Sequence, residues 1–159
     1  MMMPTVSPNS RVIAFGCDHA GFLLQQQLME KVKSRGFDVI DCGTTDQSSV
    51  DYPDFAMQVV NKILHYQAEK GVLICGTGIG MNITANRYRG IRAACCCDVN
   101  QTVIARQHND INVLCLGSRI SDETVVFDCL MAFLQTDFDG GRHQQRLDKI
   151  DSNVIAGLI

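Results

Sequence analysis

The sequence predicts an α/β fold in which a five-stranded parallel sheet lies between two layers of helices. Short apolar runs alternate with amphipathic segments along the chain, and each apolar run ends in a polar or glycine-rich loop. This alternation is typical of βαβ units joined by right-handed crossovers. The expected architecture is therefore a three-layer α/β/α sandwich with a Rossmann-like sheet.

The five expected strands are short runs rich in branched or small apolar side chains. They cover residues 11–17, 37–41, 72–74, 91–97 and 112–116. Helices are expected between and after the strands, where apolar residues recur at helical spacing. They cover residues 22–34, 52 to about 67, 81–87, 99 to about 107 and 122–135, with a last helix after Asp139.

Single residues set some of the expected helix boundaries. Pro53 suits the first turn of the second helix, and Asp98 is a favoured N-cap for the fourth. His108, Asn109 and Asp110 are expected to break the fourth helix.

Composition indicates a globular protein. Its 159 residues suffice for one ordinary domain, expected at 11–159 with a helical tail, after a flexible arm at 1–10. Hydrophobic residues make up 46% and charged residues 19%, which excludes a disordered chain. The net charge of −3 argues against nucleic-acid binding through bulk positive charge. Without a recognisable signal peptide or membrane-spanning run, a cytoplasmic location is expected.

The eight cysteines do not follow a disulfide or zinc pattern. Most of them lie in apolar runs, and they lack C-x-x-C spacing. They are expected to be reduced thiols used as small core residues. The run Cys95-Cys96-Cys97 in particular is expected to pack in the core.

The most informative stretch is the loop Cys75-Gly76-Thr77-Gly78-Ile79-Gly80, which follows a buried-strand pattern. Three glycines let a ligand approach the backbone, and a following helix would turn free N–H groups toward an anion. A thiol there is expected to lose its proton more readily than a free cysteine. The loop has neither the Walker A residues nor the glycine spacing of a dinucleotide site. A plain strand-to-helix turn with a structural cysteine is the alternative.

Polar residues also follow the other expected strands, at the edge where ligands of parallel sheets bind. This rim comprises Asp18-His19, Cys42-Gly43, residues 75–80, Asp98 and residues 117–119. Asp18 could instead only cap the first helix, whereas His19 could donate to an oxyanion or a phosphate.

Arginines near the end of the chain suggest phosphate binding. Arg142 and Arg146 are four residues apart, so on a helix they share a face, and an anion between them would relieve their repulsion. For any single arginine, Arg119 included, a solvated surface charge is the alternative. A thiol, an amide-rich loop, a histidine and arginines together suit acid–base chemistry on a small phosphorylated substrate.

Six motifs occur in fixed order between about Val12 and Ile150. They are Asp18-His19-Ala20-Gly21, Tyr52-Pro53-Asp54, Cys75-Gly76-Thr77-Gly78-Ile79-Gly80, Arg106-Gln107-His108-Asn109-Asp110, Gly117-Ser118-Arg119 and Gly140-Gly141-Arg142-His143. Together they resemble the motifs of type B ribose-5-phosphate isomerases. Some members of that family have Ser in place of the Cys and a Glu in the next loop. With Cys75 and Met81, this chain is similar to the Cys subtype.

The resemblance implies interconversion of ribose 5-phosphate and ribulose 5-phosphate through an enediolate, without metal or other cofactor. It implies that Cys75 moves a proton between C2 and C1, assisted by Thr77, and that His108 opens the furanose ring. It further implies that the substrate is held by Asp18, His19, Tyr52, Gly76, Gly78, Ile79, Gly80, Asn109, Arg119, Arg142 and Arg146.

The resemblance also implies a homodimer with active sites at the subunit interface, so that His108 and some arginines could serve the partner's site. Neither nucleic acid nor membrane is an expected partner. Two other functions stay open: a hexose-6-phosphate isomerase of the same family, for example for allose 6-phosphate, and a non-catalytic sugar-phosphate sensor.

Overall fold

The computed structural model describes residues 11–152, and every structural statement below concerns these residues. The expected N-terminal arm at 1–10 and the end of the tail at 153–159 lie outside them. The strands are β1 (Val12–Cys17), β2 (Asp38–Asp41), β3 (Lys70–Cys75), β4 (Ala93–Cys95) and β5 (Val113–Gly117). The helices are α1 (Phe22–Lys33), α2 (Tyr52–Leu64), α3 (Ile79–Ala85), α4 (Val99–Asn109), α5 (Glu123–Gln135) and α6 (Arg142–Ser152).

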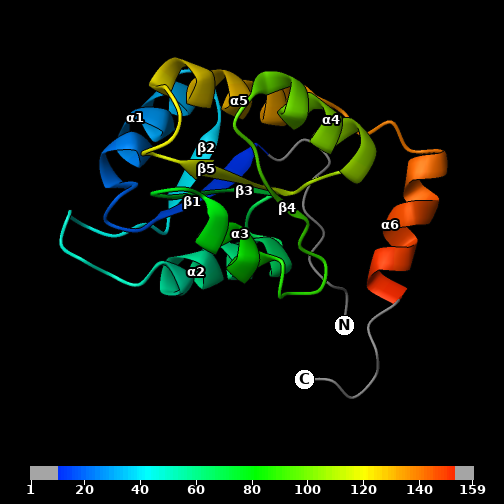
Figure 1. The fold of residues 1–159 in the computed structure, drawn as a ribbon, viewed down its shortest axis with the longest axis horizontal. Helices are drawn as coiled ribbons and strands as arrows, with labels where there is room; N and C mark the ends of the chain where they lie inside the picture. Colours follow the sequence, from blue (N-terminus) through cyan, green and yellow to red (C-terminus); the bar gives the residue numbers. More distant parts are fainter. Residues whose placement is uncertain (1–10, 153–159) are drawn as a thin grey trace.

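All five strands are parallel, in the order β2-β1-β3-β5-β4. Helices α1, α4 and α5 cover one face of the sheet, and α2 and α3 cover the other (Figure 1). The expected three-layer α/β/α sandwich is therefore confirmed. Helix α6 stands apart from both layers, beside the end of α4 (Figure 1).

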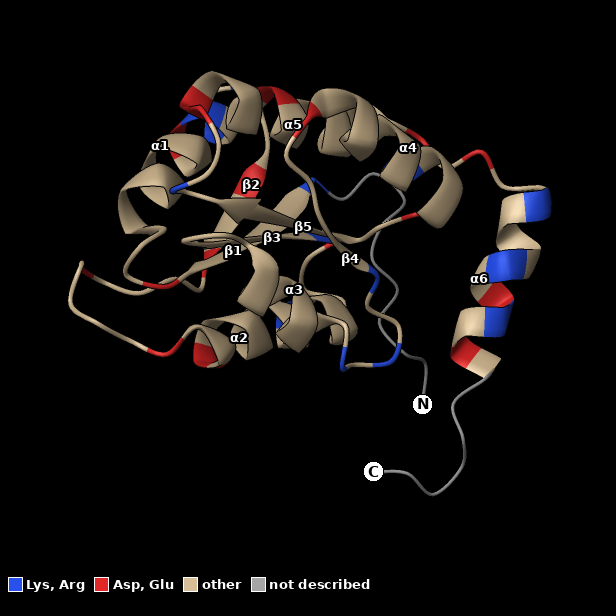
Figure 2. Ribbon diagram, in the orientation of Figure 1, with Lys and Arg blue, Asp and Glu red and all other residues tan. Residues whose placement is uncertain are grey.

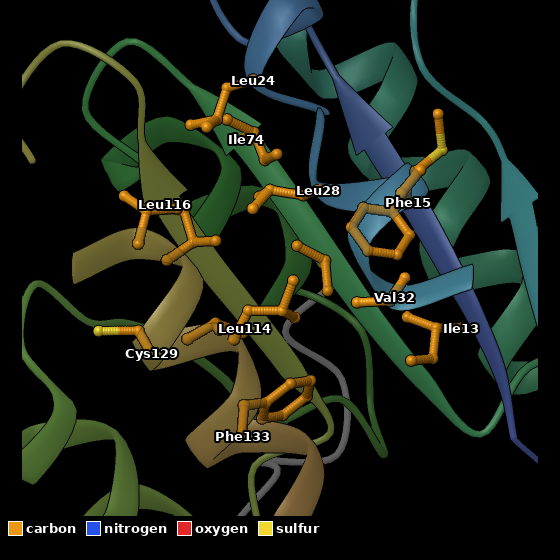
Figure 3. Packing of buried hydrophobic residues seen from close by; sticks show 14 of the residues in the cluster. Ile13, Phe15, Leu24, Leu28, Val32, Ile74, Leu114, Leu116, Cys129 and Phe133 are labelled. Atoms are coloured by element: carbon orange, nitrogen blue, oxygen red, sulfur yellow. The ribbon is translucent and has the colours of Figure 1, made fainter. Parts of the chain in front are cut away.

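A hydrophobic core fills each side of the sheet. On one side, Ile74 of β3 lies beside Leu28 of α1, and Leu114 of β5 lies beside Phe133 of α5 (Figure 3). Leu73, the neighbour of Ile74, belongs to the opposite cluster because successive side chains of a strand alternate between faces. Full burial of each such side chain stabilises the fold by about 1.5–3 kcal/mol, so both helix layers hold the strands of the sheet in place.

The edge strand β4 is shorter than the sequence predicts, and the prediction that the whole cysteine run packs in the core was wrong. The strand ends at Cys95; Cys96 is buried, Cys95 is half-buried and Cys97 is exposed. The chain leaves the sheet early because Asp98 caps α4: its carboxylate accepts a hydrogen bond from the Gln101 amide at 2.7 Å. The predicted N-cap is thus confirmed.

Helix α4 is longer than expected. His108 and Asn109 lie inside it, so the prediction that they break the helix was wrong. Asp110 alone ends it, in a left-handed conformation with φ 43° and ψ 49°. At the other helix ends, α3 begins two residues earlier than expected, at Ile79, and α2 ends at Leu64.

Within residues 11–152, no helix is both long enough and apolar enough to cross a bilayer.

Candidate active site

The carboxyl ends of β1 and β3 form the point where the sheet changes direction. From β1 the chain first adds β2 on one side and then β3 on the other. Such a switch point leaves a crevice in which α/β proteins bind ligands. Asp18 and Cys75 lie at the ends of these two strands, and the Asp18 amide donates to the Ile74 carbonyl at 3.2 Å.

The loop after β3 folds back onto the thiol of Cys75. The Gly78 amide donates to the Cys75 sulfur at 3.1 Å, and the side chain of Cys75 is buried. Gly78 reaches this position with φ 79°, a value that L-residues rarely adopt. Thr77 is exposed beside the thiol, and its hydroxyl accepts from the Ile79 amide at 3.3 Å. The loop backbone therefore contacts the Cys75 sulfur directly.

Two further predicted residues flank this loop. A Cβ placed on Gly80 would lie 2.6 Å from the ring of Tyr52, and one placed on Gly76 would lie 3.4 Å from the Arg119 guanidinium. The Arg119 amide also donates to the Gly76 carbonyl at 3.0 Å. The aromatic ring and the cation therefore lie directly against the loop backbone.

Asp18 holds its own loop rather than the first turn of α1. Its carboxylate accepts from the amides of Ala20 at 2.9 Å and Gly21 at 3.2 Å, and Gly21 is the N-cap. The suggestion that Asp18 only caps the helix is therefore wrong. His19 accepts at Nδ1 from the Val50 amide at 3.2 Å, so the neutral ring carries its proton on Nε2 and can donate there.

Ser118 ties three of these loops together. Its amide donates to the Cys75 carbonyl at 2.9 Å, and its hydroxyl donates to the Ala20 carbonyl at 2.7 Å. The sequence analysis gave Ser118 no role, although this residue lies within the motif Gly117-Ser118-Arg119. The loops after β1, β3 and β5 consequently form one connected wall, which we call the loop half-site: Asp18, His19, Tyr52, residues 75–80 and Arg119.

Most of the other thiols are buried, and burial raises their pKa values. Burial raises the pKa of Cys17 to about 12 and that of Cys96 to about 11. Burial also raises the pKa of Cys115 well above its ordinary value. The side chains of all three lie in the hydrophobic core, which confirms their predicted use as small core residues.

The second set of predicted residues lies at the end of α4, away from the carboxyl ends of the strands. Helix α4 starts beyond the carboxyl end of β4 and runs back along the sheet for eleven residues, about 16 Å. His108 and Asn109 occupy its last turn, and α6 lies beside that end (Figure 1). A single chain therefore does not bring His108 to Cys75.

His108 is in contact with the start of α6. Its ring stacks on that of His143, with centroids 4.3 Å apart and an interplanar angle of 10°. Arg142 and Arg146 are exposed on the same helix, which carries several basic residues (Figure 2). Sequence reasoning gave His143 no role, although the motif Gly140-Gly141-Arg142-His143 contained the signal. We call His108, Asn109, Arg142, His143 and Arg146 the helix half-site.

Asp139 completes a group of potential metal ligands with His108 and His143. Their ligand atoms lie within 4.8 Å of one another. The two rings are nearly parallel, however, so their in-plane lone pairs do not converge on one ion in this conformation. Desolvation lowers the pKa of His143, as do the neighbouring His108, Arg142 and Arg146, which favours a neutral ring.

Comparison with known proteins bears out the resemblance seen in the motifs. Ribose-5-phosphate isomerase B of Escherichia coli is 44% identical over 138 residues, which cover 87% of this chain and 93% of that protein. The structure of the Clostridium thermocellum ribose-5-phosphate isomerase B superposes with a TM-score of 0.88 at 40% identity, over 89% of this chain and 95% of that one.

A third relative was solved with a ligand. The Mycoplasma genitalium ribose-5-phosphate isomerase B with bound ribulose-5-phosphate superposes with a TM-score of 0.85 at 38% identity, over 89% of this chain and 94% of that one. The Ribose/Galactose Isomerase family model matches residues 13–150. The chain therefore belongs to the Ribose/Galactose Isomerase family.

Proposed function

We propose that the protein is an aldose–ketose isomerase that interconverts D-ribose 5-phosphate and D-ribulose 5-phosphate through an enediolate. The observation that carries the proposal is the Cys75 sulfur, which accepts the Gly78 amide at 3.1 Å at the switch point of the sheet. The relatives named ribose-5-phosphate isomerase B support the choice of substrate. The type of reaction needs only proton transfers, which the residues of the two half-sites can supply.

In this mechanism the Cys75 thiolate removes the proton from C2 of the open-chain aldose. The C2–H electrons form the C1–C2 double bond, and negative charge develops on the oxygen at C1. The amides of residues 76–80 stabilise that oxygen, with Thr77 beside the thiol. A proton moves from the hydroxyl at C2 to the oxygen at C1, the Cys75 thiol returns its proton to C1, and the oxygen at C2 becomes the ketone.

Ring opening precedes this step, because ribose 5-phosphate is mainly a furanose. We assign it to His108, which takes the proton of the anomeric hydroxyl and delivers one to the ring oxygen. Asn109 holds the reacting oxygens, and Asp18 and Tyr52 hold the sugar. The phosphate is bound by His19, Arg119, Arg142 and Arg146, since guanidinium groups suit phosphate oxygens.

The two half-sites then have to come from two chains. We propose a homodimer in which the helix half-site of one chain faces the loop half-site of its partner. Exposed apolar side chains lie in the loop half-site or follow it in the chain: Ile79 at 56%, Ile83 at 53% and Ile120 at 57% exposure. Side chains of this kind favour burial against a second copy.

The test is ketose formation from ribose 5-phosphate in the presence of EDTA. Wild type is compared with Cys75→Ala and with Cys97→Ala, in which an exposed thiol outside both half-sites is removed. We expect activity in wild type and Cys97→Ala and a loss of about a thousandfold or more in Cys75→Ala, with sugar-phosphate binding retained.

Other outcomes separate the remaining functions. Activity on hexose 6-phosphates in place of pentose phosphates would favour the hexose-phosphate isomerase. This function is compatible with membership of the Ribose/Galactose Isomerase family. Binding of sugar phosphates without any turnover would favour the sensor. Full activity of Cys75→Ala would leave the family unchanged and remove Cys75 as the base.

A further inference from the structure

Asp110 ends α4 in a backbone conformation that costs free energy. Its φ of 43° and ψ of 49° lie in the left-handed region, which residues with a Cβ enter rarely, though Asp tolerates it better than most. In residues 11–152, only Tyr66 and Asp110 are non-glycine residues with positive φ. Strained positions of this kind cluster at functional sites, and Asp110 directly follows His108 and Asn109.

Two arginines bind the Asp110 carboxylate, one at each oxygen. Arg106 Nη1 donates to Oδ1 at 2.8 Å, and Arg92 Nη2 donates to Oδ2 at 3.0 Å. Arg106 is only 6% exposed, so its charge depends on this partner. We call Arg92, Arg106 and Asp110 the carboxylate clamp.

The clamp also fixes the backbone that carries the helix half-site. Arg92 Nε donates to the carbonyls of Asn109 at 3.1 Å and Asp110 at 2.9 Å, which are among the orphan carbonyls of the helix end. Arg92 is itself held, because its amide donates to the Asn112 side chain at 2.8 Å. The last turn of α4 is thereby attached to the segments that lead into β4 and β5.

Arg106 extends the clamp toward α6. Its Nε donates to the Thr136 carbonyl at 3.1 Å, and its Nη1 donates to the Ile111 carbonyl at 2.6 Å. The Asp139 amide donates to the Gln107 carbonyl at 3.0 Å. One buried guanidinium thus joins the end of α4 to the segment from which α6 starts.

We propose that Asp110 is a positioning residue for ring opening, acting through His108 and Asn109 and not touching the substrate. This inference rests on the function proposed above. Without its carboxylate, Arg106 would keep a buried charge with no anionic partner, and the last turn of α4 would shift. A displacement of about 1 Å at a reacting group lowers a rate by up to about a hundredfold.

An aldose that cannot close a ring separates positioning from a purely structural role. The 4-deoxy analogue of ribose 5-phosphate cannot form a furanose, because it lacks the hydroxyl that would close the ring. Its isomerisation therefore needs the enediolate step alone. A defect in ring opening slows the reaction of ribose 5-phosphate selectively, whereas a general loss of structure slows the reactions of both substrates.

The experiment compares Asp110→Gly and Asp110→Asn with wild type on ribose 5-phosphate and on its 4-deoxy analogue. Glycine accepts the left-handed backbone but has no carboxylate, while Asn tolerates that backbone and keeps one oxygen acceptor. The matched control is Tyr66→Gly, at the other strained position. We expect Asp110→Gly to lower kcat from ribose 5-phosphate about tenfold to a hundredfold, with little change in KM, and Asp110→Asn to regain part of it.

Tyr66→Gly is expected to act as wild type on both substrates, and the rate of Asp110→Gly on the 4-deoxy analogue is expected to stay within about threefold of wild type. A wild-type kcat from ribose 5-phosphate in Asp110→Gly, or equal losses on the two substrates, would overturn the positioning role. His108→Ala serves as reference for the underlying function. If His108→Ala keeps the wild-type rate from ribose 5-phosphate, the ring-opening assignment itself fails, and the inference fails with it.

Discussion

The loop half-site and the helix half-site are held in place by different kinds of interaction. The loop half-site is built mainly from backbone: the Gly78 amide meets the Cys75 sulfur, and Ser118 links adjacent loops. The helix half-site depends on side chains: a stacked histidine pair and two arginines around Asp110. The loop half-site is held by backbone hydrogen bonds at the ends of central strands. The helix half-site is held by side chains from segments that are distant in the sequence.

The two half-sites also differ in where they lie. The loop half-site is at the carboxyl edge of the sheet, and the helix half-site is at the far end of α4. If both belong to one reaction, neither is complete within its own chain. The predictions below test this relation between the half-sites first and then the way each one is built.

The largest effect is expected from mixing two inactive variants. Cys75→Ala and His108→Ala are each expected to be nearly inactive as pure proteins. When they are unfolded together and refolded as a mixture, random pairing leaves about one quarter of the sites with both groups, if each site draws on two chains. The measurement is ketose formation by the refolded mixture relative to wild type.

Each variant refolded alone is the control for this mixing experiment. Recovery to about a quarter of wild-type activity would support sites shared between chains. A mixture as inactive as its components, with mixed dimers demonstrated by mass spectrometry, would mean that each site is formed within one chain.

Gly78→Ala is expected to destabilise the loop half-site through its backbone. A Cβ there would lie 2.8 Å from the Cys95 sulfur and 3.0 Å from the Leu116 backbone, at φ 79°. The left-handed conformation and the crowding together should lower the free energy of unfolding by about 2–4 kcal/mol. Urea denaturation measures this change.

Gly140→Ala is the matched control for Gly78→Ala. Gly140 has φ 64°, but nothing lies within 4 Å of its Cβ position. Gly140→Ala should lower the free energy of unfolding only through the left-handed backbone conformation, by about 1–2 kcal/mol. Equal losses in the two variants would show that crowding does not shape the loop.

Arg142→Ala tests the phosphate role of the helix half-site. Loss of one charge-assisted hydrogen bond to a phosphate removes about 1.5–3 kcal/mol of binding, so KM for ribose 5-phosphate should rise about tenfold to a hundredfold. Arg89→Ala, at an exposed position outside both half-sites, should leave KM unchanged. Steady-state kinetics at low salt measures both variants, and a KM equal to that of wild type would remove Arg142 from the phosphate site.

The smallest effect concerns pH and His143. Its pKa in the folded protein is lower than the ordinary 6.5, chiefly through desolvation, so the folded state binds fewer protons than the unfolded one. The stabilisation from its neutral ring is therefore present above pH 6.5 and is lost as the pH falls below that value. Denaturant midpoints should decline more steeply below pH 6.5 in wild type than in His143→Phe, which keeps a ring but does not titrate. Identical pH profiles would contradict this assignment.

The sequence alone determined the layered sheet, the glycine loop and the Asp98 cap. These features depend on neighbours in the chain: an apolar run makes a buried strand, three glycines open a loop, and a carboxylate accepts from an amide three residues on. The motifs also indicated the family, since their order and spacing can be read directly from the sequence.

Only the tertiary structure decided the strand order, the length of β4 and the surroundings of His108. Strand β5 lies between β3 and β4, which no local signal predicts. The last turn of α4 stays helical because Arg92, from the segment before β4, caps its carbonyls. The stack of His108 on His143 joins residues far apart in the chain. Such contacts depend on how distant segments pack together, and local propensity contains no information about that packing.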